Sequence, residues 1–419
     1  MGTKRLIYLD MFYPNKTKGE TFLASEIDNV IIGEADKYIY PVWADAKDDE
    51  VLLKDFTVIK SPKLYDKKNK IIYALKEFFK WQTWKEYNEL IKSHRFSMTN
   101  AWTALSFIAD CSFFADILVR YIKKTFLEGD SIVLYAYWLH WTAYTALLTK
   151  EKLKENYNIQ ILSRAHRFDV YEYAAKGKYI PCRNALVSNL DYIFPISDDA
   201  MTVLKQYEQG ATIKLCRLGT FDKGVHISPK GECLKILTCS WIRKVKRLDL
   251  VCEALMTIKC DVEWTHIGSG EEEEHVKVLA SRINNPHVKY RFLGTKKNDE
   301  VMNYYLNEEV NVFVNVSASE GVPVSVMEAM SFGKPVIATD VGGTHEILLD
   351  KKNGYILDEK FEVNELTSKL EKICNMSDSD YNTMCRMARS QWEEMCNADT
   401  QYKEFNYILK SILNGEQLK

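Results

Sequence analysis

Two glutamates, Glu320 and Glu328, stand eight residues apart in the stretch NVSASEGVPVSVMEAMSFGKPVIATDVGG, residues 315–343. A carboxylate can accept two hydrogen bonds from neighbouring hydroxyls, and the turn between the pair leads into an apolar helix. The first helical amides, at Val324 and Ser325, have no intrahelical partner and attract anions. The spacing alone is common on solvated helices, but here both flanks are apolar. Phosphates, a ribose diol and a further hydroxyl-rich group at one site describe a nucleotide sugar.

The elements that position the pair follow from the apolar runs. NVFVNVS (311–317) predicts a strand, PVSVMEAMSFG a helix with Pro323 in its first turn, and PVIATD (335–340) the next strand. Proline is tolerated there because its missing N–H would have no helical partner. Open α/β sheets bind ligands beyond the carboxyl ends of their strands. We therefore expect Glu320 in the loop at that edge and Glu328 on the helix beside it.

Short β-type runs alternate with amphipathic helical stretches along the whole chain, without an internal repeat. This alternation predicts parallel sheets with helices on both faces. The runs form two series, with a boundary near 221–230, so we expect two Rossmann-like domains. The first series is KRLIYLD (4–10), SIVLYAY (131–137), IQILSRA (159–165) and DYIFPIS (191–197). The second is CLKILTCS (233–240), VEWTHIGSG (262–270), VKYRFLG (288–294) and the two strands named above.

The composition bounds the class of protein. The length of 419 residues favours two cores, and 46% hydrophobic residues suffice to fill them. The 56 basic and 58 acidic side chains leave a formal charge of −2, which argues against a nucleic-acid partner. The 10 cysteines form no CxxC pair and several fall in apolar runs, as expected of reduced thiols. No signal peptide or membrane-spanning apolar window is apparent, so we expect a cytoplasmic protein.

A helical stretch at about 69–127 interrupts the first series. It includes KEFFKWQTWKEYNELIK (76–92), where aromatic residues recur at helical spacing among lysines. Two interpretations stay open for this stretch. It is either a helical hairpin packed on its own domain, or an amphipathic surface that touches a membrane or a lipid-like acceptor.

The segment EGVPVSVMEAMSFGKPVIATDVGGTHEI (320–347) resembles the signature of the retaining nucleotide-sugar glycosyltransferases of family 4, which have the GT-B fold. The resemblance extends over most of the chain. Similar segments in the second half are CSWIRKVKRLDLVCEAL (239–255), HIGSGEEEEHV (266–276), FLGTKKNDEVMNYY (292–305) and SQWEEMCNADTQYKEF (390–405). Those in the first half are FYPNKTKGETFLASEI (12–27), SRAHRFDVY (163–171) and FPISDDAMTVL (194–204).

The resemblance implies a role for each position that matches the glutamate motif. Glu328 is expected to bind the ribose of the donor, and Glu320 a hydroxyl of the donor sugar. The amides expected to face the sugar and the phosphates are those of Gly321, Val322, Val324 and Ser325.

The resemblance also assigns charges to the leaving diphosphate. Lys246 matches the family's diphosphate lysine, but the arginine usual five residues earlier is replaced here by Trp241. A departing diphosphate carries negative charge that needs stabilising as the bond breaks. Arg243 or Arg247 is therefore expected to supply the second positive charge, and Arg243 is preferred because it lies nearer the loop.

The remaining matching positions are spread along the chain. His166 falls where the family places a histidine that faces the donor sugar from the other domain. Gly19 matches one glycine of the first loop, while Lys18 stands where the family often has another. Gly268 belongs to the glycine turn of the second half, and Thr295 to the segment near the base. The catalytic set implied by the resemblance is His166, Lys246 and Glu320.

The tripeptide DSD at 378–380 mimics a metal-binding Asp-x-Asp motif. It precedes a helix-like stretch, and serine and aspartate are ordinary capping residues at a helix start. We therefore expect no metal site there.

The whole resemblance implies an α/β protein of the GT-B fold, with two Rossmann-like doubly wound parallel-sheet domains facing a cleft. The expected ranges are 1–222 for the acceptor domain, 223–395 for the nucleotide-sugar domain, and 396–419 for a helix that crosses back to the first domain. The implied reaction transfers a hexose-type sugar from a nucleotide-diphosphate sugar to a carbohydrate or lipid-linked acceptor. It retains the anomeric configuration and uses no metal or cofactor. Bacterial surface polysaccharide synthesis (capsule, exopolysaccharide or O-antigen) is the expected setting. Peripheral contact with the inner face of the membrane is the open alternative for the helical stretch above.

Alternative functions of the same fold stay open. A GT-B epimerase needs further acid/base residues, and a sugar phosphorylase needs a lysine for its pyridoxal cofactor; the sequence offers no convincing candidate for either. A catalytically inactive nucleotide-sugar-binding partner or sensor is compatible with Trp241.

Overall fold

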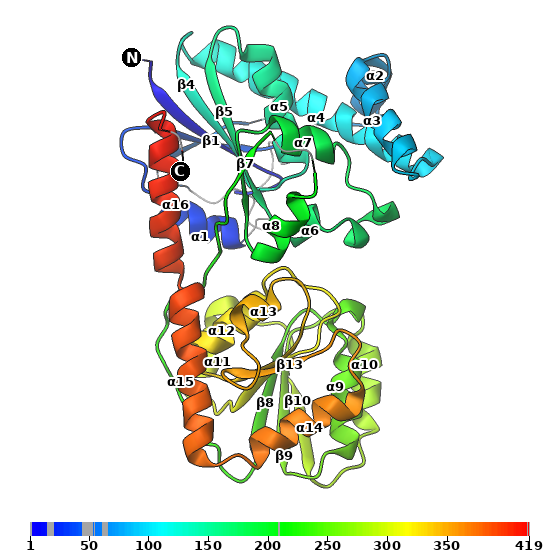
Figure 1. The fold of residues 1–419 in the computed structure, drawn as a ribbon, viewed down its shortest axis with the longest axis vertical. Coiled ribbons are helices and arrows are strands. Elements are labelled where there is room, and N and C mark those ends of the chain that lie inside the picture. The colour runs from blue at the N-terminus through cyan, green and yellow to red at the C-terminus, as the bar shows by residue number, and fades with distance from the viewer. Residues whose placement is uncertain are drawn as a thin grey trace. The chain divides into compact units, whose positions relative to one another are not determined.

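The computed structural model describes residues 2–14, 21–43, 53, 55–60, 66–207, 210–416 and 418. The chain divides into two units (Figure 1). Unit 1 consists of Met1–Ile196, Ala200–Cys216 and Tyr402–Lys419, and unit 2 of Ser197–Asp199 and Arg217–Gln401. The boundary therefore lies at 216/217 and not at the expected 222/223, and the chain returns to unit 1 at 402 and not at 396.

Unit 1 is built on a seven-stranded sheet in the order β3-β2-β1-β4-β5-β6-β7. The strands are β1 (Lys4–Asp10), β2 (Asp36–Pro41), β3 (Phe56–Val58), β4 (Ser131–Ala136), β5 (Asn158–Ala165), β6 (Tyr192–Pro195) and β7 (Thr212–Ile213). Every neighbouring pair is parallel, so the carboxyl ends of the strands lie at one edge. The residues of β1 from Leu6 to Leu9 are fully buried, as expected of a parallel sheet covered on both faces.

Helices cover both faces of this sheet (Figure 1). One face holds α1 (Thr21–Asn29) and α16 (Ala398–Leu413), whose Phe405 and Leu409 share an apolar cluster with Tyr8. The other face is covered mainly by α5 (Trp141–Leu153) and the long helix described below. Short helices complete the unit: α6 (Arg167–Val170), α7 (Arg183–Asn189) and α8 (Asp198–Leu204). The C-terminal helix thus crosses back to the first unit, as the fold class predicts.

The helical insertion between β3 and β4 consists of α2 (Lys67–Phe78), α3 (Trp81–Lys92) and α4 (Met98–Thr125). The stretch 76–92, expected as one helix, is broken at Phe79 and Lys80. The carbonyl of Glu77 accepts from Lys80 N at 3.0 Å and from Thr83 Oγ1 at 2.8 Å. These bonds satisfy a carbonyl that the ending helix leaves open, so they stabilise the corner.

The helix α4 is also the only one in the described ranges that is long and apolar enough to cross a membrane. In the structure, 72% of its most apolar window is buried inside unit 1. A buried core helix has the same length and composition, so this helix is weak evidence for a membrane span.

Unit 2 is built on a six-stranded sheet in the order β10-β9-β8-β11-β12-β13. The strands are β8 (Leu234–Cys239), β9 (Val262–Ile267), β10 (Val288–Phe292), β11 (Val312–Asn315), β12 (Val336–Thr339) and β13 (Gly354–Leu357), all parallel. The helices are α9 (Leu248–Thr257), α10 (Glu273–Ser281), α11 (Asn298–Asn307), α12 (Val324–Ser331), α13 (Thr344–Ile347), α14 (Val363–Cys374) and α15 (Asp378–Met395). Two apolar clusters, one on each face, confirm the doubly wound arrangement.

The start of α15 holds the tripeptide that mimics a metal-binding motif. Ser377 is the N-cap of the helix, and its side chain accepts from the backbone N–H of Asp380 at 3.1 Å. Asp378 lies in the same first turn, where a carboxylate favours the helix dipole. The capping residue is therefore Ser377, and the predicted capping tripeptide forms the first turn of the helix.

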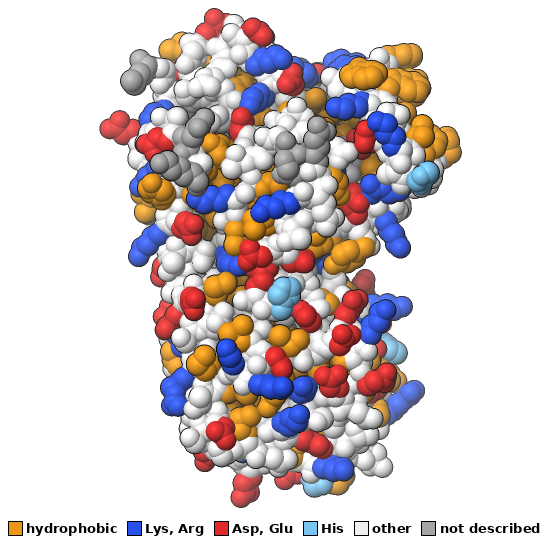
Figure 2. All heavy atoms as spheres, in the orientation of Figure 1, with side chains coloured by type: hydrophobic (Ala, Val, Ile, Leu, Met, Phe, Trp, Pro, Cys, Tyr) orange, Lys and Arg blue, Asp and Glu red, His pale blue; other side chains and the backbone are white. Residues whose placement is uncertain are grey.

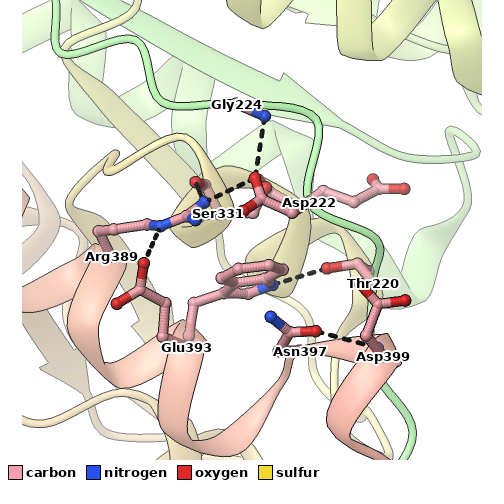
Figure 3. A network of polar contacts seen from close by, with 10 residues as sticks. Thr220, Asp222, Gly224, Ser331, Arg389, Glu393, Asn397 and Asp399 are labelled. Carbon is pink, nitrogen blue, oxygen red and sulfur yellow. Dashed lines mark hydrogen bonds and ion pairs between the residues drawn. The ribbon is translucent and has the colours of Figure 1, made fainter. Parts of the chain in front are cut away.

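The segment 217–224 is fastened to α15 by side-chain bonds (Figure 3). Arg389 lies 3.1 Å from one carboxylate oxygen of Asp222 and 2.5 Å from the other. Trp392 Nε1 donates to Thr220 Oγ1 at 2.8 Å. These contacts attach the segment to unit 2, and they are the physical reason for the shifted boundary.

Candidate functional site

The loop 316–323 follows β11 at the carboxyl edge of the unit 2 sheet. It packs closely against the loop after β12. A Cβ on Gly342 would lie 2.2 Å from the carbonyl oxygen of Glu320, and Gly342 has φ +54, which L side chains rarely adopt. The N–H of Gly343 donates to the carbonyl of Gly321 at 2.7 Å. The glycine pair after β12 therefore fixes the backbone that carries Glu320.

Lys246 and Glu320 contact each other at this edge. Lys246 ends the 3-10 turn Lys244–Lys246 before α9, and its Nζ lies 2.6 Å from Glu320 Oε1. Asn315 Nδ2, from the end of β11, donates to the same oxygen at 3.3 Å. The side chains of the ion pair are only 23% and 13% exposed. In such a partly desolvated place, opposite charges attract more strongly than at an open surface.

Glu328 lies on α12 and has a different partner. Asn298 Nδ2, from the first residue of α11, donates to Glu328 Oε1 at 2.6 Å. Burial raises the pKa of Glu328 to about 7, while the hydrogen bond from Asn298 lowers it by a smaller amount. The carboxyl group is therefore partly protonated near neutral pH. A ligand that donates hydrogen bonds to it would favour the ionised form.

Cys239, at the end of β8, lies close enough to Glu328 and Lys246 for their charges to affect its thiol. Burial raises the pKa of its thiol to about 12, with a smaller increase from the charge of Glu328 and a decrease from that of Lys246. Glu328, Lys246 and the bound Glu320 therefore gather near the carboxyl end of β8. Sequence reasoning missed Cys239 because a cysteine in an apolar run is typical of a core.

The N-terminus of α12 opens toward the same edge of the sheet. Pro323 is its N-cap, and the amides of Val326 and Met327 donate to the carbonyl of Pro323 at 3.1 and 3.2 Å. The amides of Val324 and Ser325 donate to no group in the described part of the chain. Free N–H groups and the helix dipole together give this end a positive electrostatic potential.

The two candidate arginines differ in what they contact. Arg247 donates three hydrogen bonds of 2.6–3.2 Å to backbone carbonyls, those of Val316, Ser317 and Glu359. Arg243 is exposed, and its guanidinium lies 6.0 Å from the centre of the Trp241 ring. Within the described ranges Arg243 makes no ion pair or side-chain hydrogen bond. Arg247 is thus held by the loop, while the donors of Arg243 have no partner in the described ranges.

Three other donor-site candidates of unit 2 are packed against neighbouring residues or exposed at the surface. A Cβ on Gly268 would lie 1.9 Å from the carbonyl oxygen of Ser240, so this glycine allows two loops to pack. Val322 is buried in an apolar cluster of unit 2. Thr295 is exposed beyond the end of β10. All three follow strands at the carboxyl edge of the unit 2 sheet.

His166 belongs to unit 1, where it follows β5. Its ring Nε2 lies 3.1 Å from the carbonyl oxygen of Tyr137, so Nε2 carries the ring proton. The ring packs against Tyr137 and Trp138, with centroids 4.8 and 4.6 Å away. Burial and, to a smaller extent, the charge of Arg164 lower the pKa of His166 to about 3. The ring is therefore neutral.

Two side chains that hold the glutamates were missed from the sequence. Asn315 lies in the quoted stretch, but its position at a strand end predicts a turn as well as it predicts a ligand contact. Asn298 opens a helix, where asparagine is an ordinary capping residue. The expected Gly19, with its neighbour Lys18, lies outside the described residues.

Most of unit 2 matches a known protein family. Residues 226–391 match the family described as Glycosyl transferases group 1. This range contains the unit 2 sheet and every candidate of the second half, from Trp241 to Glu328. Unit 2 is therefore similar to the domain that this family describes.

Solved structures extend the likeness to the whole chain. Sucrose-phosphate synthase from Thermosynechococcus elongatus has a TM-score of 0.71 at 14% identity, covering 99% of this chain and 100% of that one. The Anabaena protein HepE, solved in complex with UDP, has a TM-score of 0.64 at 14% identity, covering 98% of this chain and 100% of that one. At this identity the likeness concerns the fold alone. The chain has the GT-B fold.

Curated relatives match parts of the chain. A protein named as an uncharacterized glycosyltransferase from Methanocaldococcus jannaschii is 34% identical over 31% of this chain and 35% of its own length. The protein WcaL from Escherichia coli K12, named as a putative colanic acid biosynthesis glycosyltransferase, is 24% identical over 63% of this chain and 68% of its own length. The chain spans about a third of the length of the first relatives it matches.

Proposed function

We propose that this protein is a glycosyltransferase that moves a sugar from a nucleotide-diphosphate sugar to a carbohydrate or lipid-linked acceptor. The observation that carries the proposal is the gathering of Lys246, Glu320 and Glu328 near the carboxyl end of β8 in a domain similar to the glycosyltransferase group 1 family. The name of WcaL supports bacterial surface polysaccharide synthesis as the setting. The UDP complex of HepE supports a nucleoside diphosphate as the leaving group.

Each group has one task in the proposed complex. Glu328 accepts hydrogen bonds from the ribose diol, and the amides of Val324 and Ser325 bind phosphate oxygens. When the donor binds, Lys246 pairs with the diphosphate in place of Glu320. Glu320 then accepts a hydrogen bond from a hydroxyl of the donor sugar. Because a partly buried charge without a partner is costly, this exchange keeps both groups paired before and after binding.

We infer a transfer that retains the anomeric configuration and uses no metal or cofactor. The bond between the anomeric carbon and the diphosphate oxygen breaks, and the acceptor hydroxyl bonds to that carbon on the same face. The departing diphosphate takes the proton of that hydroxyl. Lys246, Arg243 and the α12 dipole stabilise the charge that develops on the diphosphate. His166 faces the donor sugar with its neutral ring.

One observation favours a competing function. Trp241 occupies the position of the usual diphosphate arginine, as a catalytically inactive nucleotide-sugar sensor or partner would allow. The exposed guanidinium of Arg243 beside that ring supports an active enzyme, because it returns a positive charge to the same loop.

The decisive experiment incubates the purified protein with UDP-, GDP-, ADP- and dTDP-sugars and follows the products by NMR. We expect slow release of free sugar and nucleoside diphosphate, with the anomeric configuration of the donor, insensitive to a chelator and lost in Lys246→Ala. Nucleotide-sugar binding without any release would establish the sensor instead. Conversion of a nucleotide sugar into its epimer would establish the epimerase.

We further propose that the helical insertion contacts an anionic membrane surface. A row of aromatic rings runs over α2, α3 and the loop that follows, with neighbouring centroids 5.3–6.3 Å apart; we call it the aromatic row. Its members are Phe79, Phe78, Trp84, Tyr87 and Phe96. Figure 2 shows hydrophobic side chains gathered, with basic ones between them, where Figure 1 draws α2 and α3.

The charges of the insertion favour this partner. The exposed lysines of α2 and α3 are Lys67, Lys68, Lys76, Lys85 and Lys92. Two of the three acidic residues of the stretch point inward. Glu77 accepts from Ser112 at 2.6 Å, and Glu86 is buried with a bond from Cys182 N at 2.9 Å. The outer surface therefore combines exposed aromatic rings with basic groups, which is typical of helices at membrane surfaces.

A further inference from the structure

A cavity of ≈ 380 Å³ lies in unit 1 between α4, the start of α5 and α6. Its size is in the range of ligand-binding cavities in proteins. The lining residues that matter here are Lys70, Trp102, Ser106, Asp110, His140 and Phe168. All of them belong to unit 1, so this cavity is formed without the donor-site residues of unit 2.

One side of the cavity is a line along α4. Trp102, Ser106 and Asp110 are four residues apart, so they lie on one face of the helix. Trp102 is 56% exposed and Asp110 is buried, so the line runs from an open aromatic ring to a deep carboxylate. Lys70 Nζ, from α2, lies 3.4 Å from the carboxylate of Asp110.

The opposite side carries an imidazole with an unused nitrogen. His140 is only 7% exposed, and within the described residues its buried Nδ1 has no hydrogen-bond partner. Its ring lies 4.9 Å from that of Phe107 and 5.3 Å from that of Phe168. Burial lowers the pKa of His140 to about 3, so the ring is neutral. Buried polar atoms without a partner are costly, and a bound hydroxyl would satisfy this one.

A row of rings connects the cavity to His166. The ring of Phe168 lies 6.2 Å from that of Trp138, which lies 4.6 Å from that of His166. His140 follows β4 and His166 follows β5, so both lie at the carboxyl edge of the unit 1 sheet. The cavity is therefore adjacent to the residue that the proposed function brings to the donor sugar.

We propose that this cavity binds a sugar ring of the acceptor. The half-exposed rings of Trp102 and Phe168 offer flat, electron-rich faces to the C–H groups of a sugar. Ser106, Asp110 and His140 accept or donate hydrogen bonds to its hydroxyls. A lipid chain in the same place would leave the buried Nδ1 of His140 without a partner. That the sugar belongs to the acceptor rests on the proposed function; that the cavity binds a sugar does not.

Saturation-transfer NMR with four octyl glycosides tests the proposal. The probes carry glucose, galactose, mannose or N-acetylglucosamine, and each presents a sugar ring and an alkyl chain to the protein in one molecule. We expect saturation of the ring protons of at least one probe. The signal should fall at least about five-fold in Trp102→Ala and in His140→Phe, which remove a stacking face and a hydrogen-bonding atom. Tyr407→Ala, which removes an aromatic ring 69% exposed on α16, should keep it.

Each outcome decides the matter. Ring saturation that is absent for all four probes, or that persists in Trp102→Ala, overturns the proposal. Saturation confined to the alkyl chain overturns it in favour of a lipid site. Hydrolysis of nucleotide sugars by the wild type is measured alongside. Ring saturation without hydrolysis leaves the sugar cavity standing and sinks the proposed function, and hydrolysis without ring saturation does the reverse.

Discussion

Lys246 Nζ and Glu320 Oε1 lie 2.6 Å apart, so the two side chains expected to bind different parts of a nucleotide sugar bind each other. In the proposed complex, this contact would make Glu320 a competitor of the diphosphate for Lys246. Removing the carboxylate therefore has two opposite effects, one on free nucleotide and one on turnover.

We predict that Glu320→Ala binds nucleoside diphosphate as tightly as the wild type or more tightly, because Lys246 is released from its pair. Turnover should fall about 10²–10³-fold, the usual cost of removing a group that acts in the transition state. Calorimetry and initial rates measure the two effects separately. Glu365→Ala, at an exposed carboxylate on α14, serves as the control and should change neither. A weakened affinity with unchanged turnover would show that Glu320 binds the nucleotide instead.

Glu328→Ala should weaken binding of nucleoside diphosphate by about 1–3 kcal/mol, the range for lost hydrogen bonds to a charged group. The ionised carboxylate is the better acceptor for a ribose diol. With a pKa of about 7, Glu328 is ionised at pH 8 and largely protonated at pH 6. The affinity advantage of the wild type over Glu328→Gln should therefore shrink as the pH falls from 8 to 6. The ratio cancels the titration of the nucleotide itself, and a ratio independent of pH would remove the ribose assignment.

The same pKa predicts a dependence of stability on pH. The folded protein keeps the Glu328 proton up to about pH 7, whereas the unfolded chain releases it near the ordinary value of 4.5. This contribution to stability is therefore fully present below pH 4.5 and is lost as the pH rises through 7. Glu328→Gln has no titrating group at this position, so its stability does not change in this way. The melting temperature of the variant relative to that of the wild type should therefore rise between pH 5 and pH 8. Parallel melting curves over this range would contradict the assignment.

Arg243→Ala and Arg247→Ala should fail in different ways. Arg247 donates to three backbone carbonyls, so its loss should lower the melting temperature, since a buried carbonyl left unpaired, such as that of Val316, costs about 1–3 kcal/mol. Arg243 contacts only an exposed ring, so its loss should spare the melting temperature and reduce turnover. Lys246→Ala should nearly abolish transfer. A greater loss of turnover in a fully stable Arg247→Ala would reverse our choice of the diphosphate arginine.

The aromatic row predicts binding to anionic vesicles at low salt. Changing both Phe79 and Trp84 to Ser should reduce co-sedimentation while the protein stays folded, because both side chains are exposed. Raising the salt should weaken binding, since the lysine contribution is screened over about 10 Å at 0.1 M. Tyr407→Ser is the matched control, an exposed aromatic outside the insertion. If the wild-type protein does not bind such vesicles at low salt, the aromatic row has only a structural role.

The site elements could be predicted from the sequence because their apolar runs end at turn residues. The run 311–317 became β11, and the helix after Pro323 became α12. β2 was missed, since its sequence DKYIYP begins with two charges and ends in proline, which are depleted in strands. β13 was missed because GYIL is a short run. A helix or strand could thus be predicted from the sequence where its run of apolar residues was long.

The chemistry of single side chains was less predictable. Arg247 has φ 49, a left-handed conformation that turns its guanidinium to three carbonyls, and nothing in its neighbours' types signals this. The break at Phe79 and Lys80 depends on the side chain of Thr83, which reaches back to a carbonyl six residues away. Both outcomes depend on where a side chain points, which the spacing of residue types does not encode.

The return of α16 to unit 1 has a consequence for synthesis of the chain. Phe405, Leu409 and their neighbours complete an apolar cluster whose other members, such as Tyr8 and Tyr135, are made near the beginning. The ribosome produces Arg217–Gln401, and with it nearly all of unit 2, before it reaches these residues. Unit 2 is thus able to fold during translation, whereas unit 1 leaves part of its sheet uncovered until the last helix emerges. In the cell, unit 1 therefore completes its folding after unit 2. Its uncovered apolar surface is the one that a chaperone would have to bind.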